Sequence, residues 1–215
     1  MTYKSSHTEA SQTSGHVIHS PARIYDFLAW IILRGREPAL REKMVDLAAL
    51  KPGETVLDVG CGTGTLLIAA KRRIGASGRA FGIDPSPEMI ARAQKKARRL
   101  GADIAFQIGI VESLPFPEAY CDAVLSTLMI HHLPADVRER GAQEIARVLK
   151  PGGRVLAVDF GEADDGKHGL FSFFTHSHGH VRTAEMRAMF GQAGLNVTDS
   201  GAVGMANLHY VLAVA

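Results

Sequence analysis

Hydrophobic residues follow two spacings along the chain, one typical of buried strands and one typical of helices. Short apolar runs, which suit parallel strands covered on both faces, occur at residues 54–59, 78–84, 103–110, 122–129 and 154–160. Amphipathic stretches that predict helices lie between and after them, at residues 66–75, 86–100, 136–150 and about 183–193. Two further apolar runs, at residues 195–204 and 208–215, predict strands at the end.

This alternation of strands and helices predicts an α/β fold. Strands separated by helices form a parallel sheet with helices on both faces. The last two strands have no room between them for a crossover helix, so they should form a hairpin in which one strand runs antiparallel. The expected fold is therefore a doubly wound, seven-stranded, mostly parallel sheet, with ligands bound beyond the carboxyl ends of its strands.

The first fifty residues have a different pattern. Residues 1–15 are polar and predict a disordered tail. Two helical patterns follow, at residues 21–33, where Pro21 suits a first helical position, and at residues 37–50. We expect residues 16–50 to form a helical lid in the same domain as a core that spans residues 51–215.

Composition and charge narrow the class of protein. The chain is 46% hydrophobic and 21% charged, and its net charge of +2 gives no reason to expect nucleic acid or a membrane surface as partner. The two cysteines are far apart, which indicates neither a zinc site nor a disulfide framework and fits a reducing compartment. The apolar run at residues 27–33 is too short to span a bilayer, and the polar N-terminus has no signal-peptide pattern, so we expect a cytoplasmic protein.

Candidate chemistry begins at the end of the first predicted strand, in the stretch VLDVGCGTG. Gly60, Gly62 and Gly64 follow that strand and precede a helix, and glycines there permit a tight turn and close approach of a ligand. Asp84 ends the next strand, where a carboxylate can accept hydrogen bonds from both hydroxyls of a ribose. The combination predicts a nucleoside ligand.

The charge of Asp58 indicates which nucleoside is expected. The dinucleotide pattern GxGxxG would need a glycine at Thr65, and a pyrophosphate would be repelled by a carboxylate at position 58. S-Adenosylmethionine carries an ammonium and a sulfonium beside its ribose. Provided that Asp58 points toward the turn, charge favours this sulfonium nucleoside over a nicotinamide dinucleotide.

Five ordered motifs resemble those of class I S-adenosylmethionine-dependent methyltransferases, most closely the ubiquinone/menaquinone-biosynthesis-type branch with its Rossmann-like fold. They are VLDVGCGTG, GIDPSPEMI, ESLPFPEAYCDAVLS, HHLP and RVLKPGGRVLAVDF. The resemblance implies that the methionine part of S-adenosylmethionine is held by Asp58 and the turn Gly60, Cys61, Gly62 and Gly64. It also implies that Asp84 binds the ribose and that Pro85 and Met89 wall one face of the adenine.

The chain departs from this family at the adenine. Many relatives have an acidic residue that accepts the adenine amino group, and the matching position here is Ile110. Two alternatives remain: backbone at Val111 with apolar contacts holds the adenine, or Glu112 takes over. Glu112 can also be read as a solvent-exposed loop acid.

Candidate catalytic residues come from two histidines and one tyrosine. His131 and His132 follow a strand near the expected ligand edge, where an imidazole can act as base or simply shape the pocket. The resemblance places Tyr25 over the cofactor, where it contacts the ligand or only packs. Asp159, at the end of the fifth strand, is a further candidate for the cleft.

A second histidine group, at positions 176, 178 and 180, could meet a metal, belong to a substrate lid or lie on a surface loop. No cysteine or acid nearby completes a ligand set, so no metal is expected.

The favoured function is methyl transfer from S-adenosylmethionine to a small-molecule acceptor by in-line displacement. Such a reaction needs positioning and, for some acceptors, removal of a proton. Several aromatic residues would make the acceptor pocket flat or apolar if they line it: Phe27, Trp30, Phe171, Phe173 and Phe174. The alternative is a non-catalytic nucleoside-binding protein on the same fold, and a nicotinamide oxidoreductase is disfavoured by Asp58 and Thr65. The motifs identify neither the acceptor nor the oligomeric state.

Overall fold

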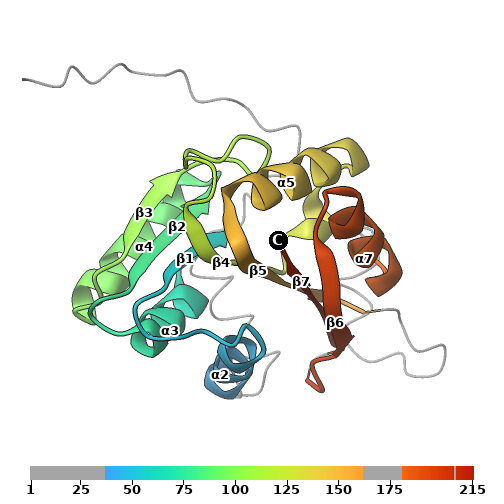
Figure 1. The fold of residues 1–215 in the computed structure, drawn as a ribbon. Coiled ribbons are helices and arrows are strands. Elements are labelled where there is room, and N and C mark those ends of the chain that lie inside the picture. The colour runs from blue at the N-terminus through green and yellow to red at the C-terminus, as the bar shows by residue number, and fades with distance from the viewer. Residues whose placement is uncertain (1–36, 162–180, 206) are drawn as a thin grey trace, which may run out of the picture.

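A computed structural model describes residues 37–161, 181–205 and 207–215 of the chain (Figure 1). Its strands are β1 (Thr55–Val59), β2 (Arg79–Asp84), β3 (Ala105–Ile108), β4 (Cys121–Thr127), β5 (Leu149–Phe160), β6 (Asn196–Ala202) and β7 (Leu208–Val214). Its helices are α2 (Glu37–Leu47), α3 (Thr65–Ile74), α4 (Pro87–Arg99), α5 (Ala135–Val148), α7 (Thr183–Gln192) and the short 3-10 helix η1 (Ile130–His132). The predicted helix at residues 21–33 lies outside the described residues.

The seven strands form one sheet in the order β3-β2-β1-β4-β5-β7-β6. Strand β7 is antiparallel to β5 and β6, and the other neighbouring pairs are parallel. This confirms the predicted fold, including the single antiparallel strand in a C-terminal hairpin. Chain order reverses between β1 and β4, so the carboxyl ends of these two strands mark the place where such sheets bind ligands.

Two apolar layers cover the faces of the sheet. Helices α2, α3 and α4 pack against one face through a core that includes Leu40, Leu67 and Ala93. Helices α5 and α7 pack against the other face, through a core that includes Ile145 and Phe190 (Figure 1). Central strands β1 and β4 are therefore covered on both sides, which explains the continuous apolar runs in their sequence.

Helix α4 begins as its sequence predicts. The Oγ of Ser86 accepts a hydrogen bond from the backbone N–H of Met89 at 3.3 Å, and Pro87 takes the first helical position. Because Ser86 comes two residues after Asp84, this cap fixes the chain directly behind the end of β2.

The predicted helix at residues 136–150 ends earlier than expected, at Val148. Strand β5 begins at Leu149, which pairs with Cys121, and the register shifts between Cys121 and Ala123. Gly153 lies so close to neighbouring carbonyls that a Cβ would stand 2.8 Å from the oxygen of Lys150. Residues 149–153, which the sequence predicted to lie outside the strand, are thus part of β5, because the sheet offers pairing partners that periodicity alone does not reveal.

Arg154 of β5 ties the end of α2 to the sheet. Its Nε and Nη2 donate to the carbonyls of Ala48 and Ala49 at 2.5 and 2.7 Å, and both Nη atoms bind the carboxylate of Glu54 at 2.9 and 2.8 Å. Burial opposes the charge on Glu54, but the hydrogen bonds from Arg154 outweigh it, and the pKa of Glu54 is lowered. The contact matters for function because α2 also carries a residue of the candidate site.

We expect Arg154→Met to lower the free energy of unfolding by about 3 kcal/mol, because it leaves Glu54 and two carbonyls without their shared donor. The matched control is Arg140→Met, which breaks an exposed ion pair with Asp136 and should change stability by under about 1 kcal/mol. Urea unfolding at pH 7 measures both. Equal losses in the two variants would contradict this role of Arg154.

Candidate functional site

Two buried acids end neighbouring strands at the carboxyl edge of the sheet. Asp58 is the penultimate residue of β1 and Asp84 is the last residue of β2, and the parallel register pairs Asp58 with Gly82. Asp58 is 1% exposed and Asp84 is 9% exposed. The fold thus brings together two carboxylates that are 26 residues apart in the chain and gives neither much contact with water.

The glycine turn between β1 and α3 has one open side. Gly60, Gly62 and Gly64 all have positive φ angles, of 71°, 51° and 74°. A Cβ at Gly60 would collide with Met129, and one at Gly64 would collide with Phe106, whereas one at Gly62 would meet nothing within 4 Å. A ligand can therefore approach the backbone closely at Gly62.

Asp84 organises this turn. Its Oδ2 accepts a hydrogen bond from the backbone N–H of Gly62 and its Oδ1 accepts one from Ser86, both at 2.9 Å. Burial raises the pKa of Asp84, although these two hydrogen bonds oppose the rise. Each oxygen keeps a lone pair, so the carboxylate can still accept hydrogen bonds from two hydroxyls of a ligand.

Asp58 has an acceptor without a donor. Its Oδ1 is buried and has no hydrogen-bond partner among the described residues. Burial, and next the charge of Asp84, raise the pKa of Asp58 to about 8, while the charge of Arg41 opposes the rise. An orphaned carboxylate oxygen beside a second carboxylate favours a cationic ligand group that donates hydrogen bonds.

Arg41 was not among the residues predicted from the sequence. It lies on α2, and its Nε is buried. A sequence pattern could have revealed it, because Arg41 precedes the buried Met44, Val45 and Ala48 by three, four and seven positions and so falls on the apolar stripe of the helix. The charge of Arg41 acts on Asp58, so the site combines the two opposite charges that the ammonium and carboxylate of an amino acid would require.

Cys61, also predicted for the turn, is buried. Its Sγ contacts the carbonyl oxygen of Gly62 at 3.8 Å. Burial, followed by the charges of Asp58 and Asp84, raises the pKa of this thiol, so it is not a reactive nucleophile.

The residues predicted around the adenine lie after β2 and β3. Met89 and Val111 are buried, and Pro85 is half-buried. The side chain of Val111 packs so tightly on α5 that a Cβ at Gly141 would come within 2.8 Å of it, which leaves only its backbone for a ligand. The half-buried Ile110 offers no side-chain acceptor, and Glu112 is half-buried with a shielded Oε2, rather than a fully exposed loop acid.

The two predicted histidines occupy η1, directly after β4. His131 contacts Asp159 at the end of β5, with 2.6 Å between Nδ1 and Oδ1. The His132 ring lies tilted against the His131 ring, with 3.9 Å between centroids, and its Nδ1 is buried. Tyr25, the five candidate aromatic residues and the histidines at 176, 178 and 180 lie outside the described residues.

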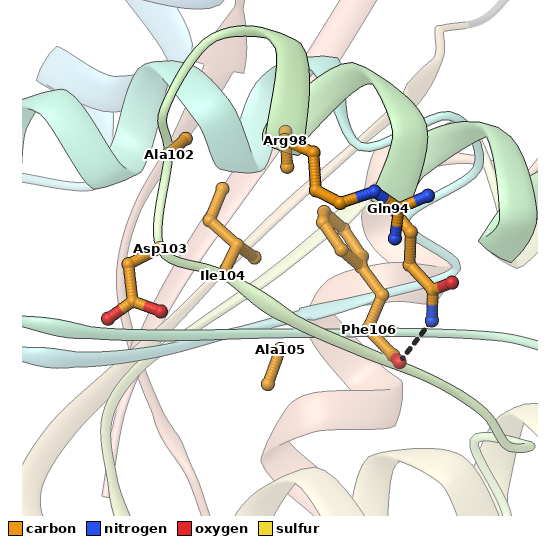
Figure 2. Close-up of a pocket in the computed structure, with 8 residues that line it drawn as sticks. Gln94, Arg98, Ala102, Asp103, Ile104, Ala105 and Phe106 are labelled. Atoms are coloured by element: carbon orange, nitrogen blue, oxygen red, sulfur yellow. Dashed lines mark hydrogen bonds between the residues drawn. The ribbon is translucent and has the colours of Figure 1, made fainter.

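A separate hollow of about 430 Å³ lies between α4 and β3 (Figure 2). Gln94 and Arg98 line it from α4, and Ala105 and Phe106 from β3; the Gln94 amide donates to the Phe106 carbonyl at 3.2 Å. This hollow lies along the outer edge of the sheet and includes neither Asp58 nor Asp84. The Phe106 ring, however, continues inward to the glycine turn.

The described ranges hold no group of three or more His, Cys, Asp or Glu side chains that could bind a metal ion. Within those same ranges, no helix is both long enough and apolar enough to cross a membrane.

Comparisons with known proteins agree with this geometry. Residues 56–153 match the family model described as a methyltransferase domain. The ubiquinone/menaquinone biosynthesis C-methyltransferase UbiE of Enterobacter sp. (strain 638) is 30% identical over 147 residues, which are 67% of this chain and 58% of that protein. The chain thus spans less than two thirds of the length of this relative.

Two solved structures extend the likeness to more of the chain. A SAM-dependent methyltransferase from Aquifex aeolicus has a TM-score of 0.71 and 25% identity, and the match covers 91% of this chain and 98% of that one. The YcgJ protein of Bacillus subtilis has a TM-score of 0.63 and 30% identity, over 76% of this chain and 71% of that one.

Asp58→Asn should stabilise the ligand-free protein at high pH. The pKa of Asp58 is higher in the folded than in the unfolded chain, so its stabilising contribution is complete below about pH 4 and is lost as the pH rises to about 8. We expect the amide to raise the free energy of unfolding by about 3 kcal/mol at pH 8, and by less at pH 5.

Urea unfolding at the two pH values measures this difference, with Asp103→Asn, which alters an exposed acid, as the control. A gain that is equal at pH 5 and pH 8 would show that the Asp58 carboxyl is not held at a raised pKa.

Proposed function

Because the chain belongs to the class I S-adenosylmethionine-dependent methyltransferases, we propose that it transfers the methyl group of S-adenosylmethionine to a small-molecule acceptor. The transfer is an in-line displacement, in which a nucleophile of the acceptor attacks the methyl carbon as the carbon–sulfur bond breaks. The cofactor supplies the reactivity, and the protein positions the two reactants. The acceptor is flat or apolar if the aromatic residues near positions 27–30 and 171–174 line its pocket.

The observation that carries this proposal is the charge pattern around Asp58. The methionine end of the cofactor is a zwitterion with an ammonium and a carboxylate. The orphaned Oδ1 of Asp58 suits the ammonium, and the guanidinium of Arg41 suits the carboxylate. A pyrophosphate would instead add two negative charges to a site that already holds two carboxylates.

The rest of the cofactor fits the remaining parts of the edge. Asp84 accepts hydrogen bonds from the ribose hydroxyls through its free lone pairs, and the cofactor lies against the open side of Gly62. Pro85 and Met89 wall one face of the adenine. The backbone at Val111 meets the adenine edge, since the Val111 side chain is committed to α5.

The second candidate function is a nucleoside-binding protein without catalysis. Ile110 favours it, because a site without an acidic partner for the adenine amino group binds its cofactor less tightly. A screen of small acceptors that measures S-adenosylhomocysteine formation separates the two functions. Turnover of any acceptor argues for the enzyme, and cofactor binding without turnover across a broad panel argues for the binding protein.

Gly62→Val should abolish binding of S-adenosylhomocysteine while the protein stays folded. The new side chain enters the only open side of the turn among its three glycines. Gly101→Val is the matched control, since Gly101 also has a positive φ, of 64°, and nothing within 4 Å of its Cβ position, yet it follows α4 far from the turn. Calorimetry measures binding, and thermal unfolding measures stability.

We expect similar losses of stability in the two variants and loss of binding in Gly62→Val alone. Unchanged affinity in Gly62→Val would overturn the placement of the cofactor, and absence of binding to the unaltered protein would overturn the proposed function.

Ile110→Asp should tighten binding of S-adenosylhomocysteine about tenfold, because a charge-assisted hydrogen bond to the adenine amino group contributes on the order of 1.5 kcal/mol. Leu100→Asp, at the C-terminal end of α4 and 48% exposed, serves as the control and should leave the affinity unchanged. Calorimetric titration of both variants tests this. Unchanged or weaker binding in Ile110→Asp would mean that the adenine edge lies elsewhere.

A further inference from the structure

We propose that His131 is the base that removes a proton from the acceptor, and that Asp159 is the positioning residue that prepares His131 for this step. The acceptor class that follows is one whose attacked atom, or an atom conjugated to it, carries a weakly acidic proton. This inference rests on the proposed methyl transfer and extends it to the chemistry of the acceptor.

Asp159 holds His131 at two points. The Asp159 side chain is fully buried at the end of β5, and its Oδ1 lies 2.6 Å from Nδ1 of His131. Its Oδ2 accepts a hydrogen bond from the backbone N–H of the same histidine at 3.1 Å. The backbone N–H of Phe160 donates to Oδ1 at 2.8 Å and fixes the carboxylate itself. Backbone and ring of His131 are thus held by one side chain from a neighbouring strand.

This arrangement determines which nitrogen of His131 is available. An ionised carboxylate only accepts hydrogen bonds, so Nδ1 carries the proton and the neutral ring keeps its lone pair on Nε2. Among the described residues, Nε2 of His131 has no hydrogen-bond partner, and this nitrogen is not fully shielded from solvent. The side chain is only 8% exposed, so access is limited to a small part of the ring.

The neighbouring rings keep the imidazole in place. The Phe160 ring meets the His131 ring edge-on at 5.2 Å between centroids, and the His132 ring lies at 3.9 Å. This packing distinguishes the two predicted histidines: His131 has an anchored Nδ1 and an accessible Nε2, whereas the Nδ1 of His132 is buried.

The pair lies beside the glycine turn that is proposed to hold the methyl donor. Strand β4 pairs with β1 on one side and with β5 on the other, so the ends of these three strands adjoin. Met129, two residues before His131, places its side chain against Gly60 of the turn. One short segment after β4 therefore links the donor turn to the proposed base.

Nε2 of His131 takes the proton from the acceptor, whose electron pair attacks the methyl carbon as the carbon–sulfur electrons pass to sulfur. The products are the methylated acceptor, S-adenosylhomocysteine and a protonated His131, whose positive charge is offset by Asp159. The proton then passes to solvent, and the cycle can repeat.

The acceptor class follows from this chemistry. A base contributes nothing to a tertiary amine, which has no proton, and little to a thiolate, which has already lost one. It assists acceptors with a weakly acidic O–H, such as a phenol or an enol, methylated on oxygen or on a conjugated carbon. A buried, doubly held histidine would be an unused feature in an enzyme for tertiary amines.

The charges near the pair must be considered for its pH dependence. On α5, Arg138 donates from Nε to the carbonyls of Ile130 and Leu133. Its guanidinium lies 3.9 Å from Glu185 on α7, which offsets the charge. On β7, His209 stands opposite Asp159 in the register, but its Nδ1 pairs with Thr183 at 3.1 Å. The remaining titratable ring beside His131 is that of His132, with 3.9 Å between the two ring centroids.

The first test uses the full chain saturated with S-adenosylhomocysteine and needs no acceptor. In the neutral form of the His131 ring, nitrogen-15 NMR of labelled histidines should show the proton on Nδ1. In Asp159→Asn, whose amide can donate to Nδ1, the proton should move to Nε2. A proton on Nε2 in the neutral ring of the unaltered protein would overturn the inference.

The second test measures turnover on simple phenols such as catechol, with dithiothreitol as an acceptor that supplies its own thiolate. For a phenol, kcat should fall about 10²–10⁴-fold in His131→Gln, and the rate should no longer rise with pH. In Asp159→Asn the same pH profile should shift, whereas the KM for S-adenosylmethionine stays unchanged in both. Methylation of dithiothreitol should be much less affected.

His209→Gln serves as the control for loss of a histidine at this edge and should retain the pH profile. Equal losses on catechol and dithiothreitol, or an unaltered pH profile in His131→Gln, would contradict a base. Calorimetry with S-adenosylhomocysteine distinguishes failure of the proposed function from failure of this inference. If the unaltered protein does not bind S-adenosylhomocysteine, the proposed function is wrong. If it binds but the neutral His131 ring carries its proton on Nε2, only the role of the His131–Asp159 pair is wrong.

Discussion

Two carboxylates that the sheet forces together determine the character of this site. Parallel register brings Asp58 and Asp84 to the same edge, and burial removes the water that would separate their charges. Asp84 is compensated by backbone N–H groups of the glycine turn and of the α4 cap. Asp58 has Arg41 as an opposing charge and one oxygen with no donor. A ligand that brings an ammonium completes this arrangement, whereas one that brings phosphate opposes it.

The site therefore depends on contacts that lie far from it. Arg41 reaches Asp58 only if α2 is held in place, and the last carbonyls of that segment are held by Arg154 from β5. Arg154 in turn is fixed by Glu54, immediately before the strand that carries Asp58. Stability and ligand recognition therefore depend on the same contacts. The Arg154 guanidinium binds the carbonyls that follow α2, and it thereby fixes the helix that carries Arg41.

Much of the fold followed from local patterns, and the rest depended on long-range packing. Apolar runs and glycine positions predicted the strands, the single antiparallel strand and the acids at 58 and 84, since each of these leaves a mark within a few residues. Arg41 was missed because its partner lies on another element. The proposed preference for His131 over His132 depends on the contact of His131 with Asp159, which is 28 residues away. Helix α5 ended two residues early because Leu149 found a partner in the sheet.

Phe106 connects the hollow between α4 and β3 with the glycine turn. Its carbonyl belongs to the edge strand β3 and accepts a hydrogen bond from the Gln94 amide (Figure 2). Its ring packs against Gly64 and Gly82. An edge strand is usually free to vary, because little rests on it. Here a side chain from the edge strand packs beneath the glycine turn. Substitutions in this strand would therefore be tolerated during evolution only where they leave the turn in place.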